Sequence, residues 1–176
     1  MLKKFLLAAC AVAGLAGCAG VAPEVYRGQT PTLDLADYFD GPLTAWGYFA
    51  DRSGQVQKRF KVQMRGEWQG NRGVLTEDFA WSDGTTSRRV WRIEKHPDGR
   101  YSGRADDVKG AATGVAAGNA LQWRYTLHLP VDGKVYEVQF DDWMYLMDEE
   151  VMLNKSEMRK FGFKLGEIVI AFRKAP

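Results

Sequence analysis

The sequence predicts an all-β fold: an antiparallel meander of about eight to ten strands that closes into a barrel, with a short helical turn before the first strand. Two observations support this prediction. Apolar and polar residues alternate along several segments, which is typical of strands that are buried on one face. Turn sequences containing glycine separate these segments, roughly every 8 to 12 residues. Closure into a barrel would leave the sheet without exposed edges.

The first 17 residues have the layout of a secretory signal peptide. Lys3 and Lys4 supply positive charge, and residues 5–17 contain no charged residue and end in small ones. This apolar run is shorter than the roughly 20 residues that a membrane-spanning helix needs. We therefore expect residues 1–17 to be an export signal that is removed from the mature protein.

Cys18 is the expected attachment point of a lipid. The sequence LAGC at residues 15–18 is similar to the bacterial lipobox, whose cysteine is lipidated and becomes the new first residue. The sequence ending at Cys10 matches the same pattern, but cleavage there would leave an apolar segment of only about five residues, which is short for a signal. An ordinary soluble secretory signal is the alternative. Ala19 replaces the aspartate that retains lipoproteins in the inner membrane, so the resemblance implies the inner leaflet of the outer membrane, facing the periplasm.

Removal of the signal changes what the composition means. The whole chain has 24 basic and 22 acidic residues, but Lys3 and Lys4 belong to the signal, which leaves 22 of each. A neutral chain gives no electrostatic support for binding nucleic acid. Cys18 would be the one remaining cysteine, so no disulfide could form within the chain. We expect residues 18–32 to be the lipidated start and a flexible tether, and residues 33–176 to be the barrel domain.

Two segments show the alternation most clearly. In residues 56–68 the apolar side chains at 56, 60, 62, 64 and 68 share one parity, and the polar side chains at 57, 59, 61, 63, 65 and 67 take the other. Residues 121–129 repeat this pattern. Residues 110–120 are built of small residues and predict a kinked strand or a broad loop, while residues 150–161 are expected to be extended rather than helical. Weaker alternation predicts strands over 43–52, 73–82, 86–95, 100–107, 134–140, 143–148 and 163–173.

Four features together resemble a known protein family. They are the lipobox-like start, the segment LTAWGYFADRSG at residues 43–54, the basic strand that ends in Trp68, and the segment from Phe140 to Ile168. These features are similar to a family of Gram-negative lipoproteins catalogued as domain of unknown function 3833. The family has no established activity, so the resemblance implies an envelope location and a β-rich fold rather than a reaction.

More distantly, the chain resembles the lipocalins. These are eight-stranded barrels, often with a short helical turn before the first strand and an arginine near the end of the barrel. Residues 33–39 could form the turn, and Arg173 lies near the end of the last predicted strand. The resemblance implies a lipocalin-like barrel, whose interior is either filled by side chains or open to one small ligand.

The residues that would line such a barrel are the candidate ligand-binding residues. Glu77 shares the parity of Leu75 and Phe79, so it either points inward, with Arg92 as a possible partner, or is turned outward by a bulge, which we expect. The candidate lining residues are Met64, Trp68, Glu77, Phe79, Trp81, Arg92, Trp123 and Tyr125.

Several kinds of chemistry find little support. His96 and His128 are expected to be exposed, and no cysteine remains to join them in a metal site. The acidic residues at 141, 142 and 148–150 are expected to be solvated and to flank turns, because they follow no calcium-binding pattern. We therefore expect no catalytic residues, no metal, no cofactor and no enzymatic activity.

Binding or carriage of a hydrophobic ligand, such as a fatty acid or a lipid-like molecule, is the function that these features favour. The membrane, reached through the lipid anchor, is the partner that the sequence predicts. An interaction or scaffold lipoprotein with a filled barrel is the alternative, and a hydrolase with a carboxylate site is the third possibility.

Overall fold

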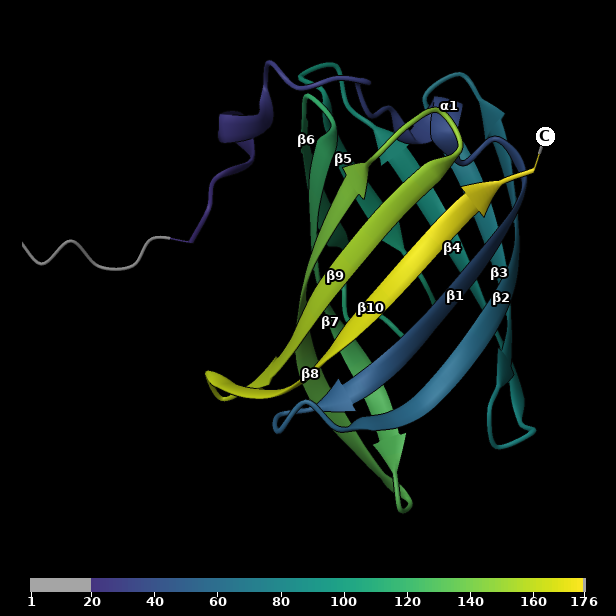
Figure 1. Cartoon of the computed structure of the whole chain (residues 1–176), viewed down its shortest axis with the longest axis vertical. Coiled ribbons are helices and arrows are strands. Elements are labelled where there is room, and N and C mark those ends of the chain that lie inside the picture. Colours follow the sequence, from purple (N-terminus) through teal and green to yellow (C-terminus); the bar gives the residue numbers. More distant parts are fainter. Residues whose placement is uncertain (1–19, 176) are drawn as a thin grey trace, which may run out of the picture.

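The protein is a closed antiparallel β-barrel of ten strands (Figure 1). The computed structural model describes residues 20–175, so the predicted signal peptide, Cys10 and Cys18 lie outside the described residues. The strands follow one another around the barrel in sequence order, and the first pairs with the last. The elements are η1 (Pro23–Tyr26, a 3-10 helix), α1 (Leu35–Tyr38), β1 (Gly41–Asp51), β2 (Val56–Gln69), β3 (Arg72–Trp81), β4 (Thr86–Lys95), β5 (Arg100–Arg104), β6 (Ala112–Ala117), β7 (Ala120–Val131), β8 (Lys134–Leu146), β9 (Val151–Lys160) and β10 (Phe163–Lys174).

The predicted all-β barrel and its N-terminal helical turn are confirmed, and two strand boundaries differ. The strands predicted over 134–140 and 143–148 form the single strand β8, because Asp141 and Asp142 pair across to β7 and β9 instead of making a turn. The strand predicted over 100–107 ends at Arg104. Within residues 20–175, no helix is long and apolar enough to cross a membrane.

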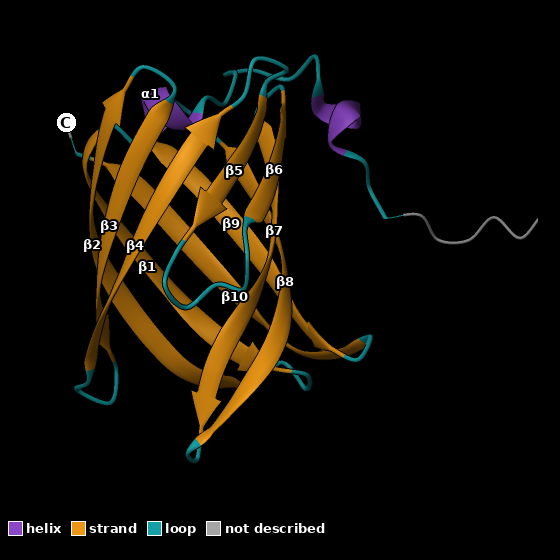
Figure 2. Ribbon diagram, turned by 180° about the vertical axis from the view of Figure 1, so that it is seen from behind, coloured by secondary structure: helices purple, strands orange, loops and turns teal. Residues whose placement is uncertain are grey.

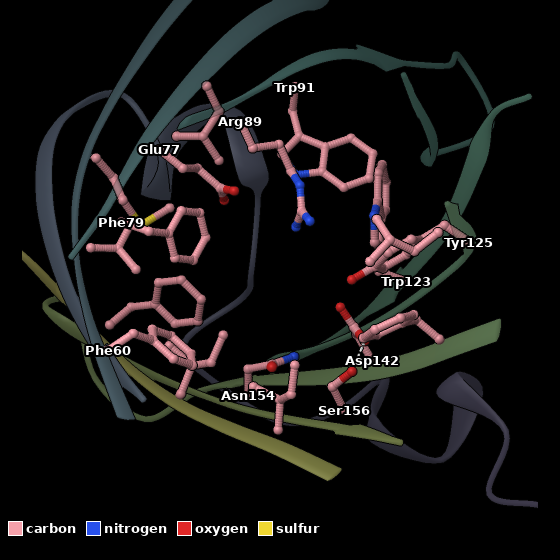
Figure 3. A pocket seen from close by; sticks show the side chains of 18 of the residues that line it. Phe60, Glu77, Phe79, Arg89, Trp91, Trp123, Tyr125, Asp142, Asn154 and Ser156 are labelled. Carbon is pink, nitrogen blue, oxygen red and sulfur yellow. Dashed lines mark hydrogen bonds between the residues drawn. The ribbon is translucent and has the colours of Figure 1, made fainter. Parts of the chain in front are cut away.

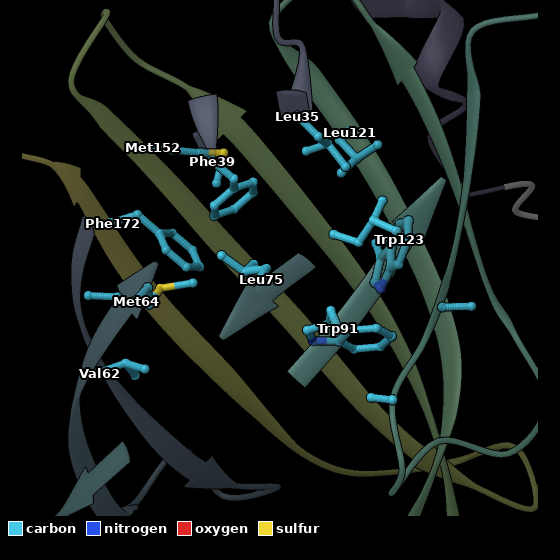
Figure 4. Close-up of a cluster of buried hydrophobic side chains, with 14 of the residues drawn as sticks. Leu35, Phe39, Val62, Met64, Leu75, Trp91, Leu121, Trp123, Met152 and Phe172 are labelled. Atoms are coloured by element: carbon cyan, nitrogen blue, oxygen red, sulfur yellow. The ribbon is translucent and has the colours of Figure 1, made fainter. Parts of the chain in front are cut away.

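The barrel has a core of inward-facing apolar side chains at the end that carries α1 (Figure 4). Leu35 and Phe39 are almost fully buried and close this end from above. Below them lie Met64 of β2, Leu121 of β7 and Phe172 of β10. Phe39 also lies edge to face with Phe172, with 5.9 Å between the ring centroids. All strand pairs, and the core residues among those described, lie within residues 33–174.

The small residues of the 110–120 segment make room for Trp123. The indole of this β7 residue lies over Gly114 of β6 and Gly103 of β5, where a Cβ atom would come within 2.5 and 2.6 Å of the ring. Any larger residue at either position would displace the tryptophan. Of the two predictions for this segment, a strand or a broad loop, the structure has the strand, at Ala112–Ala117.

The described part of the predicted tether is packed against the barrel. Residues 23–26 form η1, and the Tyr26 ring contacts Trp143 and Tyr145 on the outer face of β8, with centroid distances of 5.9 and 5.4 Å. The backbone N–H of Leu33 donates to the carbonyl oxygen of Gly118 at 2.8 Å. The outward-facing aromatic residues of β8 thus hold a segment that we expected to be flexible.

The wall of the barrel is incomplete on one side (Figure 2). β5 and β6 are short, and they pair with β4 and β7 only in the half of the barrel near α1. The loop at residues 105–111 lies across the remaining space, where Val108 forms a bridge with Leu127 of β7. On the side away from β3, the lower half of β4 therefore lies beside this loop instead of β5.

Asp34 fixes α1 over the closed end of the barrel. Its carboxylate accepts hydrogen bonds from the Ala36 backbone N–H at 2.9 Å and from the Tyr101 hydroxyl at 3.1 Å, and it forms an ion pair with Lys95. We expect Asp34→Ala to lower the free energy of unfolding by about 2–3 kcal/mol, because a helix cap and a charged hydrogen-bond acceptor are lost together. Urea unfolding measures the difference. Asp106→Ala, whose side chain is 98% exposed, should change it by less than about 0.5 kcal/mol; equal effects would contradict this role of Asp34.

Candidate ligand-binding site

The barrel encloses a cavity of about 520 Å³. Leu35 and Phe39 bound it at the α1 end, and the half-buried Lys58 and the exposed Arg88 bound it at the opposite end, so the cavity opens away from α1. Strands from the whole circumference contribute side chains to its wall. Its volume is within the range of pockets that hold small molecules, about 300–1,000 Å³.

Two aromatic groups face each other across this cavity (Figure 3). On one side, Phe60, Phe79 and Trp81 pack together with centroid distances of 5.1 to 5.8 Å. On the other, the Trp91 ring meets Trp123 and Tyr125 edge to face at 5.6 and 5.4 Å. Because these large rings pack within each group and not across the centre, they leave the middle of the barrel open.

Polar side chains of four strands, β3, β4, β8 and β9, and of the 105–111 loop border this apolar cavity. Glu77 of β3 lies opposite Arg89 of β4 in the strand register, and both side chains point inward in Figure 3. The Arg89 guanidinium donates to both carboxylate oxygens of Asp107, with Nη2 to Oδ2 at 2.7 Å and Nε to Oδ2 at 2.9 Å and to Oδ1 at 3.2 Å. This ion pair joins the lower half of β4 to the 105–111 loop. The cavity's arginine is therefore already occupied by a carboxylate of the protein.

A second polar group lies on the far side, on β8 and β9. Asp142 is buried and accepts a hydrogen bond from the hydroxyl of Ser156. Asn154 is also buried and donates from Nδ2 to the backbone oxygen of Trp143 at 3.3 Å. In residues 20–175, no group of three His, Cys, Asp or Glu side chains is arranged to hold a metal ion.

Burial raises the pKa of two of the carboxyls that line the cavity, Glu77 and Asp142. Desolvation brings the pKa of Glu77 to about 7, and the positive charge of Arg89 only partly offsets it. Desolvation likewise brings the pKa of Asp142 to about 7, against the opposing effects of the Ser156 hydrogen bond and of Arg89. Near neutral pH a large fraction of each group is therefore protonated, and can donate as well as accept a hydrogen bond.

Six of the eight predicted lining residues border the cavity, and two do not. Met64, Glu77, Phe79, Trp81, Trp123 and Tyr125 border it. Arg92 lies on the outer face with 65% of its side chain exposed, and it pairs with Asp106 at 3.7 Å, so its assignment to the interior is corrected. Trp68 faces inward near the closed end but lies over Gly73, away from the cavity.

The partner of Glu77 and the course of β3 also differ from expectation. The register of β3 against both neighbours is unbroken from Arg72 to Ala80, so no bulge turns Glu77 outward. Arg89 shares the parity of Trp91 and Ile93, which are buried, whereas Arg92 lies between them. The same parity rule that placed Glu77 inward identifies Arg89.

The buried polar residues of β8 and β9 were missed. Asp142 was expected to be a solvated residue beside a turn, but it shares the parity of Val138 and Phe140 within one long strand. Asn154 and Ser156 likewise share the parity of Met152 and Met158. An inward face is recognised from the alternation of apolar and polar residues. Polar residues on that face weaken the alternation, so the sequence provided little indication that these three residues point inward.

Comparison with protein families identifies the chain. A model described as "Protein of unknown function (DUF3833)" matches residues 12–174. The chain belongs to the DUF3833 family. No curated protein sequence matches this DUF3833 protein.

Solved structures share its fold at low sequence identity. A protein of unknown function of the DUF3598 family from Nostoc punctiforme PCC 73102 aligns with a TM-score of 0.55 and 9% identity over 84% of this chain. The alignment covers 51% of that protein, so this chain spans about half its length. A de novo designed fluorescence-activating β-barrel (TM-score 0.44, 13% identity, 81% and 99% coverage) and lobster apocrustacyanin A1 (0.36, 14%, 79% and 62%) are weaker likenesses. The first similarity supports the barrel fold alone.

The two cavity carboxyls should make the protein less stable as the pH rises. Between the ordinary carboxyl range near pH 4 and pH 7, the folded chain keeps protons that the unfolded chain has lost, so the free energy of unfolding falls. We expect a fall on the order of 1–3 kcal/mol for each group. Glu77→Gln and Asp142→Asn should each flatten the profile of urea unfolding between pH 5 and pH 8. Glu67→Gln, on the exposed face of β2, should not; identical profiles for all variants would contradict the assignment.

Proposed function

We propose that this DUF3833 protein binds a small, mainly apolar ligand inside its barrel. The observation that carries the proposal is the open cavity between two aromatic groups that pack on their own sides of the barrel. Burial of apolar ligand surface against such walls is favourable by roughly 25 cal/mol per Å². The cavity is also evidence against the alternative of an interaction or scaffold protein, because that alternative requires a barrel filled by side chains.

The polar groups of the cavity favour a particular kind of ligand. Arg89 is engaged by Asp107, so a fatty-acid carboxylate would have to displace an ion pair to reach it. Glu77, Asp142 and Ser156 instead offer hydrogen bonds from neutral or partly neutral groups. We propose an apolar molecule that carries one small hydroxyl, amide or amine group, in place of a free acid.

The binding proposal is tested by narrowing the cavity. Ile170 of β10 lines it, and Ile170→Trp should lower the affinity for the apolar dye N-phenyl-1-naphthylamine at least about tenfold, because the added ring occupies ligand volume. Fluorescence titration measures the affinity. Leu153→Trp, on the exposed face of β9, makes the same kind of change outside the cavity and should bind as the parent does. A parent protein that binds no dye, or equal affinities for all three, would refute the proposal.

A second candidate function is hydrolysis at the two cavity carboxyls. Glu77 and Asp142 reach the same cavity from opposite walls, and groups with a pKa near 7 suit general acid and base catalysis. Turnover of a glycoside or ester substrate that falls more than about 100-fold in both Glu77→Gln and Asp142→Asn would support this function. Ligand binding without turnover would exclude hydrolysis and would leave ligand binding or carriage as the proposed function.

We further propose that the protein is anchored by lipid at Cys18 in the inner leaflet of the outer membrane and faces the periplasm. The LAGC sequence and the alanine after it support this proposal. Among the described residues, η1 packs on the outer face of β8, which places residues 23–26 at the surface of the barrel.

The two early cysteines provide a matched test of the anchor. We expect Cys18→Ser to abolish lipid attachment and to release the protein from the membrane fraction, because the thiol that carries the lipid is lost. Cys10→Ser should leave both unchanged, because that residue would be removed with the signal. Mass spectrometry of the mature chain and membrane fractionation give the readouts, and a Cys18→Ser protein that keeps its lipid would exclude this attachment point.

A further inference from the structure

The β7–β8 and β9–β10 hairpins lie at the end of the barrel opposite α1 (Figure 1). Both carry exposed apolar side chains. We call residues 134–136 of the β7–β8 hairpin and 160–165 of the β9–β10 hairpin the rim. Phe161 is 84% exposed and Phe163 is 76% exposed, and Val135 and Leu165 are exposed as well. By contrast, the β1–β2 and β3–β4 turns at the same end, residues 52–55 and 82–85, contain no apolar side chain. Val56, beside the β1–β2 turn, is also exposed, but the two large exposed rings, Phe161 and Phe163, lie on the β9–β10 hairpin, so the apolar surface at this end is concentrated on the rim.

Phe161 combines an unfavourable backbone conformation with an exposed side chain that is not part of the core. Phe161 and Gly162 have φ values of 51° and 81°, and the β7–β8 hairpin uses the same conformation at Asp132 and Gly133, with 48° and 74°. Aspartate followed by glycine is a common choice for such a turn, whereas a bulky residue in the left-handed region is strained. A phenylalanine that strains the backbone and packs into no core points to a contact outside the chain.

Lysine side chains surround these apolar groups. The Nζ of Lys160 lies 4.0 Å from the ring centroid of Tyr136 and 5.2 Å from that of Phe161, so it links the two hairpins. Lys164 pairs with Glu167, but Lys134 and Lys160 take part in none of the ion pairs found among residues 20–175. Two positive charges of the rim are thus available to an external anion.

We propose that the rim docks on the surface of a bilayer that contains anionic lipid. Apolar rings at the tips of hairpins can enter the headgroup region, while long lysine side chains reach the phosphates. Charge complementarity favours a lipid surface, and the projecting tips of two hairpins present points of insertion in place of a flat protein interface.

Docking at this position would place the mouth of the cavity against the bilayer. Leu129 of β7 and Ile168 of β10 line the cavity and lie a few residues from the rim on the strands that lead from it. An apolar ligand could then pass between lipid and cavity without crossing water. This last step rests on the proposed ligand binding, whereas docking itself does not.

Vesicle binding tests the docking. The chain from residue 18, with Cys18→Ser so that neither signal nor lipid contributes, is mixed with phosphatidylcholine vesicles with or without phosphatidylglycerol, and the bound fraction is measured by sedimentation. We expect binding that needs phosphatidylglycerol and weakens with salt. Phe161→Ser with Phe163→Ser should weaken it at least about tenfold, because two exposed rings are lost. Lys134→Gln with Lys160→Gln should weaken it severalfold and reduce its dependence on salt.

Exposed apolar residues elsewhere provide the matched control. Val25→Ser with Val74→Ser removes side chains of η1 and β3 that lie away from the rim and should leave vesicle binding unchanged. Equal binding by the phenylalanine variant and the parent overturns the proposal. A parent protein that binds no vesicles also overturns it. If that parent protein self-associates in light scattering and the phenylalanine variant does not, the rim is instead an interface between two copies of the chain. Dye binding by the same variants should match the parent, which separates failure of docking from failure of the proposed ligand binding.

Discussion

The pairing of β1 with β10 is the interaction on which the rest of the structure depends. It closes the sheet at ten strands, and the radius of a barrel grows with the number of its strands. About eight strands enclose a space that side chains can fill, so ten leave more room than the inward-facing residues occupy. At the α1 end Leu35 and Phe39 supply the missing volume, and at the other end the described chain supplies no such cover.

The cavity contains charged side chains whose burial is unfavourable. Inward positions of β3, β4 and β8 carry Glu77, Arg89 and Asp142 at places where apolar residues would stabilise the fold more. Burial costs these groups their hydration, and the raised pKa of both carboxyls is the sign of that cost. Polar groups retained in an apolar cavity at such a cost are typical of sites that orient a ligand or carry out chemistry.

Much of the fold follows from the sequence because alternation and turns are local signals. The parity of residues 56–68 and 121–129 predicts the inward faces of β2 and β7, and with them Met64, Trp123 and Tyr125. The residues of the cavity were harder to predict from the sequence than the strands, for physical reasons. Asp142 follows another aspartate and resembles a turn until the pairing of β8 with both neighbours is known. The width of the interior depends on which strand closes the sheet, and no local pattern contains that information.

The proposed function requires the cavity to hold a ligand. The most direct measurement is native mass spectrometry of the protein purified from its own host without harsh detergent, followed by extraction and identification of what is released. We expect a bound species of small mass, mainly apolar and with one hydrogen-bonding group, that is lost in Ile170→Trp and retained in Leu153→Trp. Protein that is consistently free of ligand, and that also takes up none from a lipid extract of the host, would contradict it.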